Sequence, residues 1–174
     1  GRLALAIAVA AGTASGGASA NPTGAQVIHG SASFANPAAG VLNITNSAGA
    51  VLNWQSFDIG AGEITRFIQP SAASAVLNRV VSGDPSEILG TLASNGHVFL
   101  INQNGILFGR NATVDTAGLV ASTLNLGDAD FLAGRMNFTG PPEAGPIRNE
   151  GYIKTAANGT VVLIAPNIDN SGII

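Results

Sequence analysis

The stretch of residues 95–109 constrains the fold of this chain more than any other. It contains two Asn-Gly pairs, Asn95-Gly96 and Asn104-Gly105, and an apolar run lies on each side of the second pair. Asn-Gly is a strong sequence signal for a tight turn between strands, because both residues tolerate the positive φ that such turns use. Neither apolar run is long enough for a globular helix, and the glycines would weaken one. The stretch therefore predicts short strands joined by sharp corners.

Short apolar or alternating runs, separated by turn residues, recur through the rest of the chain. After residue 20 no segment keeps a helical period of about 3.6 residues over three turns. The chain is therefore predicted to be all-β. Strands are expected in residues 26–29, 40–45, 50–54, 62–68, 76–81, 95–109, 112–115, 118–123 and 159–164.

Near the end of the sequence this spacing becomes a repeat. The pattern Asn-x-Gly-x-Ile begins at Asn149 and again at Asn170, 21 residues later. A unit of this length, with two or three short strands and their corners, matches one turn of a β-solenoid. The Asn-Gly pairs that begin at Asn95 and Asn158 lie 63 residues apart, which we interpret as three such intervals. Residues 21–174 would then form about seven stacked coils.

Coiling accounts for a composition that is unusual for a globular chain. Only 10% of the residues are charged, whereas 46% are hydrophobic and Gly occurs 23 times. In stacked coils the inward positions need apolar side chains of matched size, and the corners favour Gly and Asn. The net charge of -3 leaves no basic stripe, which argues against nucleic acid as a partner. The absence of cysteine excludes disulfides, thiolate catalysis and cysteine-ligated metals.

The first residues have the composition of an export signal. Arg2 precedes a short apolar run over residues 3–11, and a small-x-small cleavage site ends at Ala20. We therefore expect residues 1–20 to be a partial signal peptide and residues 21–174 to be the folded domain. A transmembrane anchor is the weaker alternative because the run is short, and an Ala-rich core helix would lack a polar face. Since the sequence stops within a repeat, we expect the domain to be the N-terminal piece of a longer protein.

Two stretches interrupt the rhythm of short strands. Asp84-Pro85 is a natural helix cap and first helical position, so one helical turn is expected over residues 86–89. Residues 125–148 contain prolines and charges that the rest of the chain lacks. We expect them to form an excursion outside the coils.

Candidate catalytic and metal-binding residues are few. His29 and His97 lie in strands or turns without a Gly-x-Ser-x-Gly elbow, so surface or corner positions are expected. Asp128 and Asp130 are a close carboxylate pair, but they lack the ring of oxygen ligands that calcium needs and are expected in a solvated loop. The other acids are not spaced by one coil, which argues against a carbohydrate-active enzyme. No enzymatic role, cofactor or metal is therefore assigned. Glycosylation is left open at the sequons that begin at Asn43, Asn111, Asn137 and Asn158.

Several motifs occur together in one order along the chain. They lie in residues 53–60, 67–70, 76–80, 95–109, 112–115 and 118–123. The motif positions singled out are Asn53, Trp54, Phe57, Asn78, Arg79 and Val80. In this order the motifs resemble the secretion domain of the filamentous haemagglutinin family of two-partner secretion exoproteins. The resemblance covers essentially residues 21–174.

The resemblance implies both a fold and a function. The fold is a right-handed parallel β-helix with an N-terminal cap and extra-helical strands, at the front of a long adhesin, haemolysin or toxin-delivery protein. The implied partner is the set of periplasmic POTRA domains of a dedicated outer-membrane β-barrel transporter. The chain would cross the periplasm of a Gram-negative bacterium, leave unfolded through the transporter, and fold outside, secreted or at the cell surface. The alternative function is adhesion, in which loops such as residues 125–148 bind a host or neighbouring cell.

One family motif, Asn-Pro-Asn-Gly-Ile, falls on five consecutive residues. They are Asn102, Gln103, Asn104, Gly105 and Ile106, with Gln in place of Pro. Proline would pre-set φ before the corner, so Gln103 should loosen the turn in the unfolded chain without forbidding it in the folded one. Two interpretations stay open: a corner needed for folding, or an element that the transporter recognises. The family's second motif, Asn-Pro-Asn-Leu, has its nearest counterpart at Asn36-Pro37, which we interpret as a turn.

Overall fold

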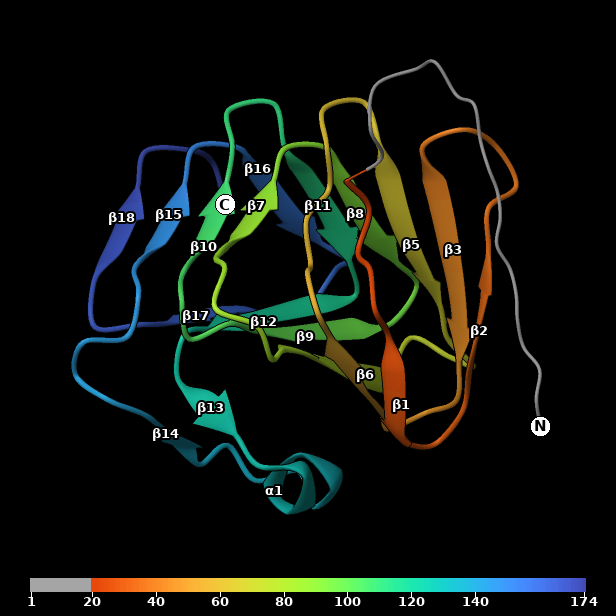
Figure 1. Cartoon of the computed structure of the whole chain (residues 1–174), viewed down its shortest axis with the longest axis horizontal. Helices are drawn as coiled ribbons and strands as arrows, with labels where there is room; N and C mark the ends of the chain where they lie inside the picture. The colour runs from red at the N-terminus through yellow and green to blue at the C-terminus, as the bar shows by residue number, and fades with distance from the viewer. Residues whose placement is uncertain (1–19) are drawn as a thin grey trace.

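The chain winds into a β-solenoid of about six turns. This computed structural model describes residues 20–174, so the predicted signal peptide lies outside the described residues except for Ala20. Each turn consists of short strands that stack on those of the neighbouring turns, as Figure 1 shows. The predicted all-β parallel β-helix is confirmed.

Three sheets form the walls of the solenoid. Sheet I contains, in spatial order, β1 (Gln26–His29), β4 (Ala50–Trp54), β6 (Ala75–Val80), β9 (His97–Ile101), β12 (Gly118–Ser122) and β17 (Val161–Ile164). Sheet II contains β16 (Tyr152–Thr155), β11 (Thr113–Thr116), β8 (Thr91–Ser94), β5 (Ile64–Ile68), β3 (Val41–Asn46) and β2 (Ala32–Ala35). Sheet III contains β18 (Ile168–Asn170), β15 (Ile147–Asn149), β10 (Ile106–Phe108) and β7 (Ser86–Ile88).

The 21-residue repeat is the register of the last coils. Arg148 pairs with Asp169 and Asn149 with Asn170, so the two Asn-x-Gly-x-Ile units stack directly on one another. The Asn149 side-chain Nδ2 donates to Asn170 Oδ1 at 2.9 Å. The repeat therefore carries an asparagine ladder from one coil to the next.

The interpretation of the 63-residue interval as three coils is wrong. Ala117 N donates to Gly96 O at 3.0 Å, and Gly159 lies against the Ala117 carbonyl, so the interval spans two coils. The second of these coils is longer because the chain between β12 and β15 leaves the solenoid without adding a rung. Early coils are long as well, since Ala50 pairs with Val76. These extra residues reduce the expected seven coils to about six.

Two antiparallel strands cap the first coil. β1 pairs antiparallel with β4 and β2 antiparallel with β3, whereas the strands of the coils pair in parallel. The cap covers strand edges that would otherwise be free to pair with another chain. The N-terminal cap that the resemblance implies is therefore present. At the start of the coil, Asn36 Nδ2 donates to Val41 O at 3.0 Å, which fits the predicted turn at Asn36-Pro37.

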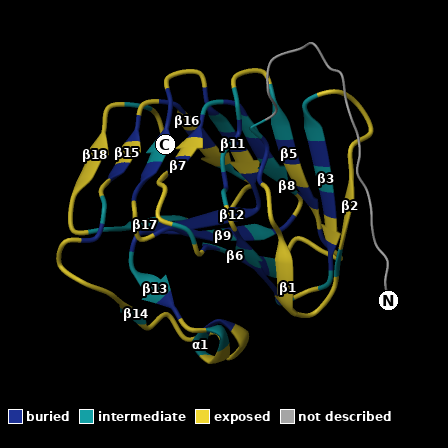
Figure 2. Cartoon of the chain, viewed as in Figure 1, coloured by how far each residue is buried: buried dark blue, intermediate teal, exposed yellow. Residues whose placement is uncertain are grey.

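A continuous apolar core fills the solenoid. Figure 2 shows that buried residues recur along the strands of its walls. Trp54, Phe57 and Phe67 are at most 1% exposed. The Trp54 and Phe57 ring centroids lie 5.6 Å apart, and those of Phe57 and Phe67 lie 6.3 Å apart. Burying one such side chain stabilises the fold by about 1.5–3 kcal/mol. The indole Nε1 of Trp54 donates to Asn78 Oδ1 at 2.9 Å, so its polar atom is satisfied inside the core.

The helical turn expected over residues 86–89 is absent, because Ser86–Ile88 is strand β7. Ser86 and Ile88 are buried while Glu87 points to solvent, which is the alternation of a strand. β7 pairs in parallel with β10 and lies at the end of sheet III, where a preceding proline costs no ladder hydrogen bond. Pairing with the next coil therefore overrides the local helix-cap signal at Pro85.

The predicted excursion is present and packs on the outside of sheet I. It contains β13 (Asn125–Leu126), α1 (Asp128–Leu132) and β14 (Phe138–Thr139), seen below the solenoid in Figure 1. Leu126 and Phe131 pack on Val51, Leu77 and Ile101, which form an apolar patch on the outer face of the sheet. The excursion ends at residue 146 and not at 148, because β15 belongs to a coil. Within the described residues no helix has the length and hydropathy to cross a membrane.

Candidate functional site at the 102–106 corner

The five motif residues form the corner between β9 and β10, here called the 102–106 corner. Gly105 N donates to Asn102 O at 3.2 Å, which closes the turn. Gly105 has a φ of 125°, in a region that side chains rarely adopt, and a Cβ there would lie 3.3 Å from Pro146 O. Glycine is therefore favoured at this position by its conformation, and a Cβ would also make a tight contact.

The Asn102 side chain is the centre of the corner. Its Nδ2 donates to Asp84 O and to Ser86 Oγ, both at 3.0 Å. Its Oδ1 accepts from the backbone N of Asn104 at 2.9 Å and from Asn104 Nδ2 at 3.0 Å. The side chain is fully buried. A single amide thus joins the corner to the segment before β7, one coil earlier.

Only two of the five side chains reach solvent. Asn102 and Ile106 are at most 2% exposed, and Gly105 is buried. Gln103 and Asn104 are exposed, although Gln103 O accepts from Gly145 N at 2.8 Å. The turn forms in the folded chain with Gln103 in the place of proline, as expected.

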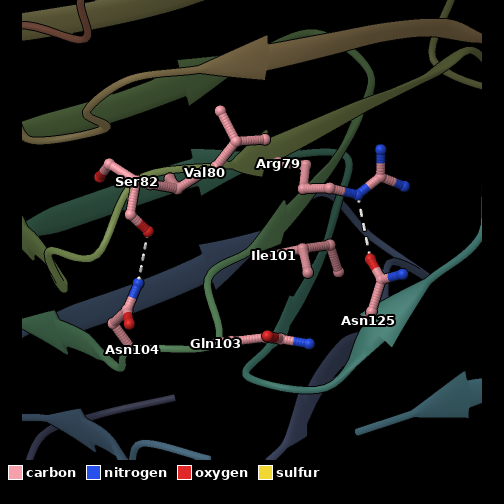
Figure 3. Close-up of a pocket in the computed structure, with 8 residues that line it drawn as sticks. Arg79, Val80, Ser82, Ile101, Gln103, Asn104 and Asn125 are labelled. Atoms are coloured by element: carbon pink, nitrogen blue, oxygen red, sulfur yellow. Dashed lines mark hydrogen bonds between the residues drawn. The ribbon is translucent and has the colours of Figure 1, made fainter.

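The exposed part of the corner borders a hollow of about 290 Å³, shown in Figure 3. Its walls are Arg79, Val80, Val81, Ser82, Ile101, Gln103, Asn104 and Asn125. Asn104 Nδ2 donates across it to Ser82 O at 2.9 Å. The fold therefore brings two of the predicted motif positions, Arg79 and Val80, beside the 102–106 corner.

Arg79 is held by four acceptors, and this group is called the Arg79 clamp. Its NH1 donates to Asn53 Oδ1 at 3.2 Å and its Nε to Asn125 Oδ1 at 3.0 Å. Its NH2 donates to Leu126 O at 2.6 Å and pairs with Asp128 Oδ1 at 2.7 Å. The Arg79 side chain is 17% exposed. The clamp ties β4 and β6 to the start of the excursion and occupies four of the five guanidinium N–H donors.

The remaining predicted positions lie in the core and away from the hollow. Trp54 and Phe57 are buried among the aromatic rings, and Asn78 is fully buried. Asn78 accepts from Trp54 Nε1 and donates through Nδ2 to Phe99 O at 3.2 Å. The bonds of Asn78 thus link β4, β6 and β9, three successive strands of sheet I. The eleven predicted site residues therefore do not converge on one surface.

The hydrogen-bond partners of Asn102 and Arg79 were not predicted from the sequence. Ser86, the partner of Asn102, lies 16 residues earlier in the chain, and only the coil register brings the two together. The solvated loop expected for Asp128 and Asp130 is wrong, because both lie in α1 and pair with Arg79 and Arg135 respectively. An acidic first helical turn is favoured by the helix dipole, and that was the available signal. Residues 20–174 contain no group of three or more His, Asp or Glu side chains placed to hold a metal ion.

Comparison with known proteins gives one consistent result. A family model described as the TPS secretion domain matches residues 18–174. The crystal structure of the HMW1 secretion domain from Haemophilus influenzae superposes with a TM-score of 0.84 at 38% sequence identity, over 88% of this chain and 42% of that one.

Curated relatives show the same likeness in sequence. The chain is 37% identical over 127 residues to a heme/hemopexin-binding protein of Haemophilus influenzae strain KW20 Rd, covering 70% of this chain and 14% of that protein. It is 42% identical over 77 residues to a second Haemophilus influenzae protein with the same name, covering 44% of this chain and 8% of that protein. The chain therefore spans only a small part of the length of these relatives.

Proposed function

Since the chain belongs to the TPS secretion domain family, we propose that it directs a larger exoprotein to a cognate outer-membrane two-partner secretion transporter and seeds its β-helix outside the cell. The observation that carries the proposal is the match over residues 18–174 together with the superposition on a solved secretion domain. A secretion role is common to the family, whose exoproteins are secreted by Gram-negative bacteria. Residues 1–20 are proposed to supply the export signal, and the module itself is proposed to be non-enzymatic.

The burial of the 102–106 corner supports a particular mode of recognition. In the folded chain Asn102, Gly105 and Ile106 are inaccessible, whereas in an open chain all five motif side chains are exposed. We propose that POTRA domains of the transporter bind the corner sequence before the coil closes. Closure outside the cell then withdraws these residues, so that a partner which binds only the open chain is released.

The direction of the hydrogen bonds supports the seeding role. The partners of the Asn102 side chain outside the corner, Asp84 and Ser86, precede it in the chain, whereas its backbone N donates to the later Ser122 O. The parallel strands likewise stack on strands that have already passed. If the chain emerges N-terminus first, each new strand can therefore pair with the exposed strand edge of the coil that has just folded.

A second candidate function is adhesion through the excursion. Leu132 and Met136 are 45% and 48% exposed on it, beside an apolar hollow of about 200 Å³. Exposed apolar side chains of this kind favour a protein contact. The relatives are named for binding heme and hemopexin, and we propose that any such binding belongs to parts of a longer protein, since the matches cover little of their length.

Export with and without the transporter tests the first proposal. The chain, given a complete signal start, is fused to a reporter and expressed in cells that have or lack the cognate transporter. Reporter outside the cell only with the transporter is the expected result, and transporter-independent release would contradict the proposal. Binding of purified residues 21–174 to cells tests adhesion, and no binding at micromolar concentration would contradict that second candidate.

A further inference from the structure

The Asn-Gly pairs are chemically reactive as well as good turn formers. When glycine follows asparagine, the unhindered backbone nitrogen of the glycine is able to attack the asparagine side-chain carbonyl carbon. This chain has three such pairs, at Asn95, Asn104 and Asn158. In each of them the glycine N–H donates a hydrogen bond, to Ser94 Oγ, Asn102 O and Ala156 O respectively. The three sites therefore differ mainly in how the asparagine side chain is held.

The Asn95 side chain is fixed at both ends. Its Nδ2 donates to Gln69 O and its Oδ1 accepts from Gln69 N, both at 2.8 Å. Gly96 is also packed against the Gln69 side chain and the Ser74 carbonyl. The side-chain carbonyl carbon is thus held in place by its neighbours in the previous coil.

The Asn104 side chain is fixed as well. Its Nδ2 donates to Ser82 O at 2.9 Å and to Asn102 Oδ1 at 3.0 Å. Reaction at Asn95 or Asn104 therefore requires local opening, in which two side-chain hydrogen bonds break.

The Asn158 side chain has no such restraint. It is exposed, and it makes no hydrogen bond with the part of the chain that the structure describes. Asn158 also has a φ of 67°, and among residues 20–174 no other residue except glycine has a positive φ. This backbone conformation is uncommon for a residue with a side chain, although asparagine tolerates it better than most. Asn158 is thus the one of the three asparagines whose side chain is unrestrained and whose φ is positive.

We propose that Asn158 is a site of spontaneous deamidation in the folded protein. The Gly159 nitrogen loses its proton and bonds to the Asn158 Cγ, the Cγ–Nδ2 bond breaks, and ammonia leaves with that proton. The product is a cyclic imide. Water then opens either of its two carbonyls, which leaves aspartate or isoaspartate at position 158. No oxidant, reductant or other reactant is required.

The reaction alters the corner between β16 and β17. It adds a negative charge there, and the isoaspartate form lengthens the backbone by one atom. Gly159 lies against the Ala117 carbonyl with no room even for a Cβ, since that atom would lie 2.3 Å from the oxygen. The isoaspartate form is therefore expected to loosen β17 from β12.

The test is a time course at mildly alkaline pH on the purified chain, read by peptide mapping and mass spectrometry. Folded protein is expected to gain the mass change at Asn158 about tenfold faster than at Asn95 or Asn104, because those two must first break side-chain hydrogen bonds. In urea the three rates should come within a few-fold of one another, since each site is then a free Asn-Gly. Asn158→Gly, which suits the positive φ, should remove the fast phase and leave the two slow sites unchanged. Equal rates at the three sites in the folded protein, or a faster rate at Asn104, would overturn the proposal.

Discussion

The 102–106 corner and the Arg79 clamp lie side by side around one hollow, but they form in different ways. The partners of the Asn102 side chain outside the corner lie 16 and 18 residues before it in the chain. Arg79 is joined to Asn125 and Asp128, which lie 46 and 49 residues after it. The Asn102 side-chain bonds to preceding residues can form as the chain emerges, before the later backbone bonds to Ser122, Gly145 and Pro146, whereas the clamp must wait for another two coils. The corner is therefore suited to seed the fold, and the clamp to secure it afterwards.

The largest loss of folding stability is expected when the Asn102 side-chain amide is removed. Asn102→Ala leaves the buried Ser86 hydroxyl and the Asp84 carbonyl without their partner, and it frees the turn at Asn104. A loss of about 2–4 kcal/mol in the free energy of unfolding is expected, measured by urea denaturation. Gln103→Ala, one residue away and exposed, should change stability by no more than about 0.5 kcal/mol. If Asn102→Ala lost no more stability than Gln103→Ala, the corner would not depend on the Asn102 amide.

A somewhat smaller loss is expected at the glycine of the corner. Gly105→Ala forces a side chain into a positive φ and against Pro146 O, at a cost of about 1–3 kcal/mol. Gly83→Ala is the matched control, because nothing lies within 4 Å of a Cβ at Gly83. Thermal unfolding of the two variants measures the difference. Equal melting temperatures would contradict the assignment of Gly105 to a strained corner.

Removing the Arg79 clamp should cost less folding stability and should loosen mainly the excursion. Arg79→Met removes four hydrogen bonds, one of which is the ion pair with Asp128. Because that carboxylate is 39% exposed, solvent screening limits the loss to about 1–2 kcal/mol. Hydrogen exchange should accelerate in residues 125–139 and stay slow at Asn104, whose backbone N is held by Asn102. A matching acceleration at Asn104 would show that corner and clamp open together and would remove the distinction between them.

The smallest change in folding stability is expected at Gln103, where the family motif has proline. Gln103→Pro should stabilise the fold by up to about 1 kcal/mol, because proline restricts the unfolded chain at a turn that already exists. Equilibrium urea unfolding, with Gln103→Ala as reference, measures the change. A loss of stability would mean that the backbone of this corner differs from the one that proline prefers.

Much of the fold followed from short-range signals in the sequence. The strands in the predicted ranges, the corners and the stacking of Asn149 on Asn170 were predicted, since alternating apolar residues and Asn-Gly corners act within a few residues. Strands such as β2, β7, β8, β15 and β18 lie outside those ranges. The coil count was wrong because a repeat measured on regular coils does not show which residues leave the stack. The helical turn after Pro85 was also wrong, because pairing of Ser86–Ile88 with β10 outweighs a local cap.

The candidate site was predictable only in part. The resemblance located the motif residues, and the Asn-Gly pair located the turn. Two contacts depend on which coils become neighbours: the hydrogen bond of Asn102 to Ser86 and the ion pair of Arg79 with Asp128. No local sequence pattern contains that information. Only the structure therefore shows which motif residues are buried and which line the hollow.

The most direct test of the central proposal is to measure binding of the transporter's POTRA domains to folded and open forms of this chain. Phe67→Asp places a charge in the core, far from the corner in sequence, and should keep the chain open with its 102–106 sequence intact. We expect binding to the Phe67→Asp chain, little binding to the folded chain, and loss of binding when Asn102→Ala is added to the open chain. Equal binding to the folded and open chains, or binding that is unaffected by Asn102→Ala, would contradict it.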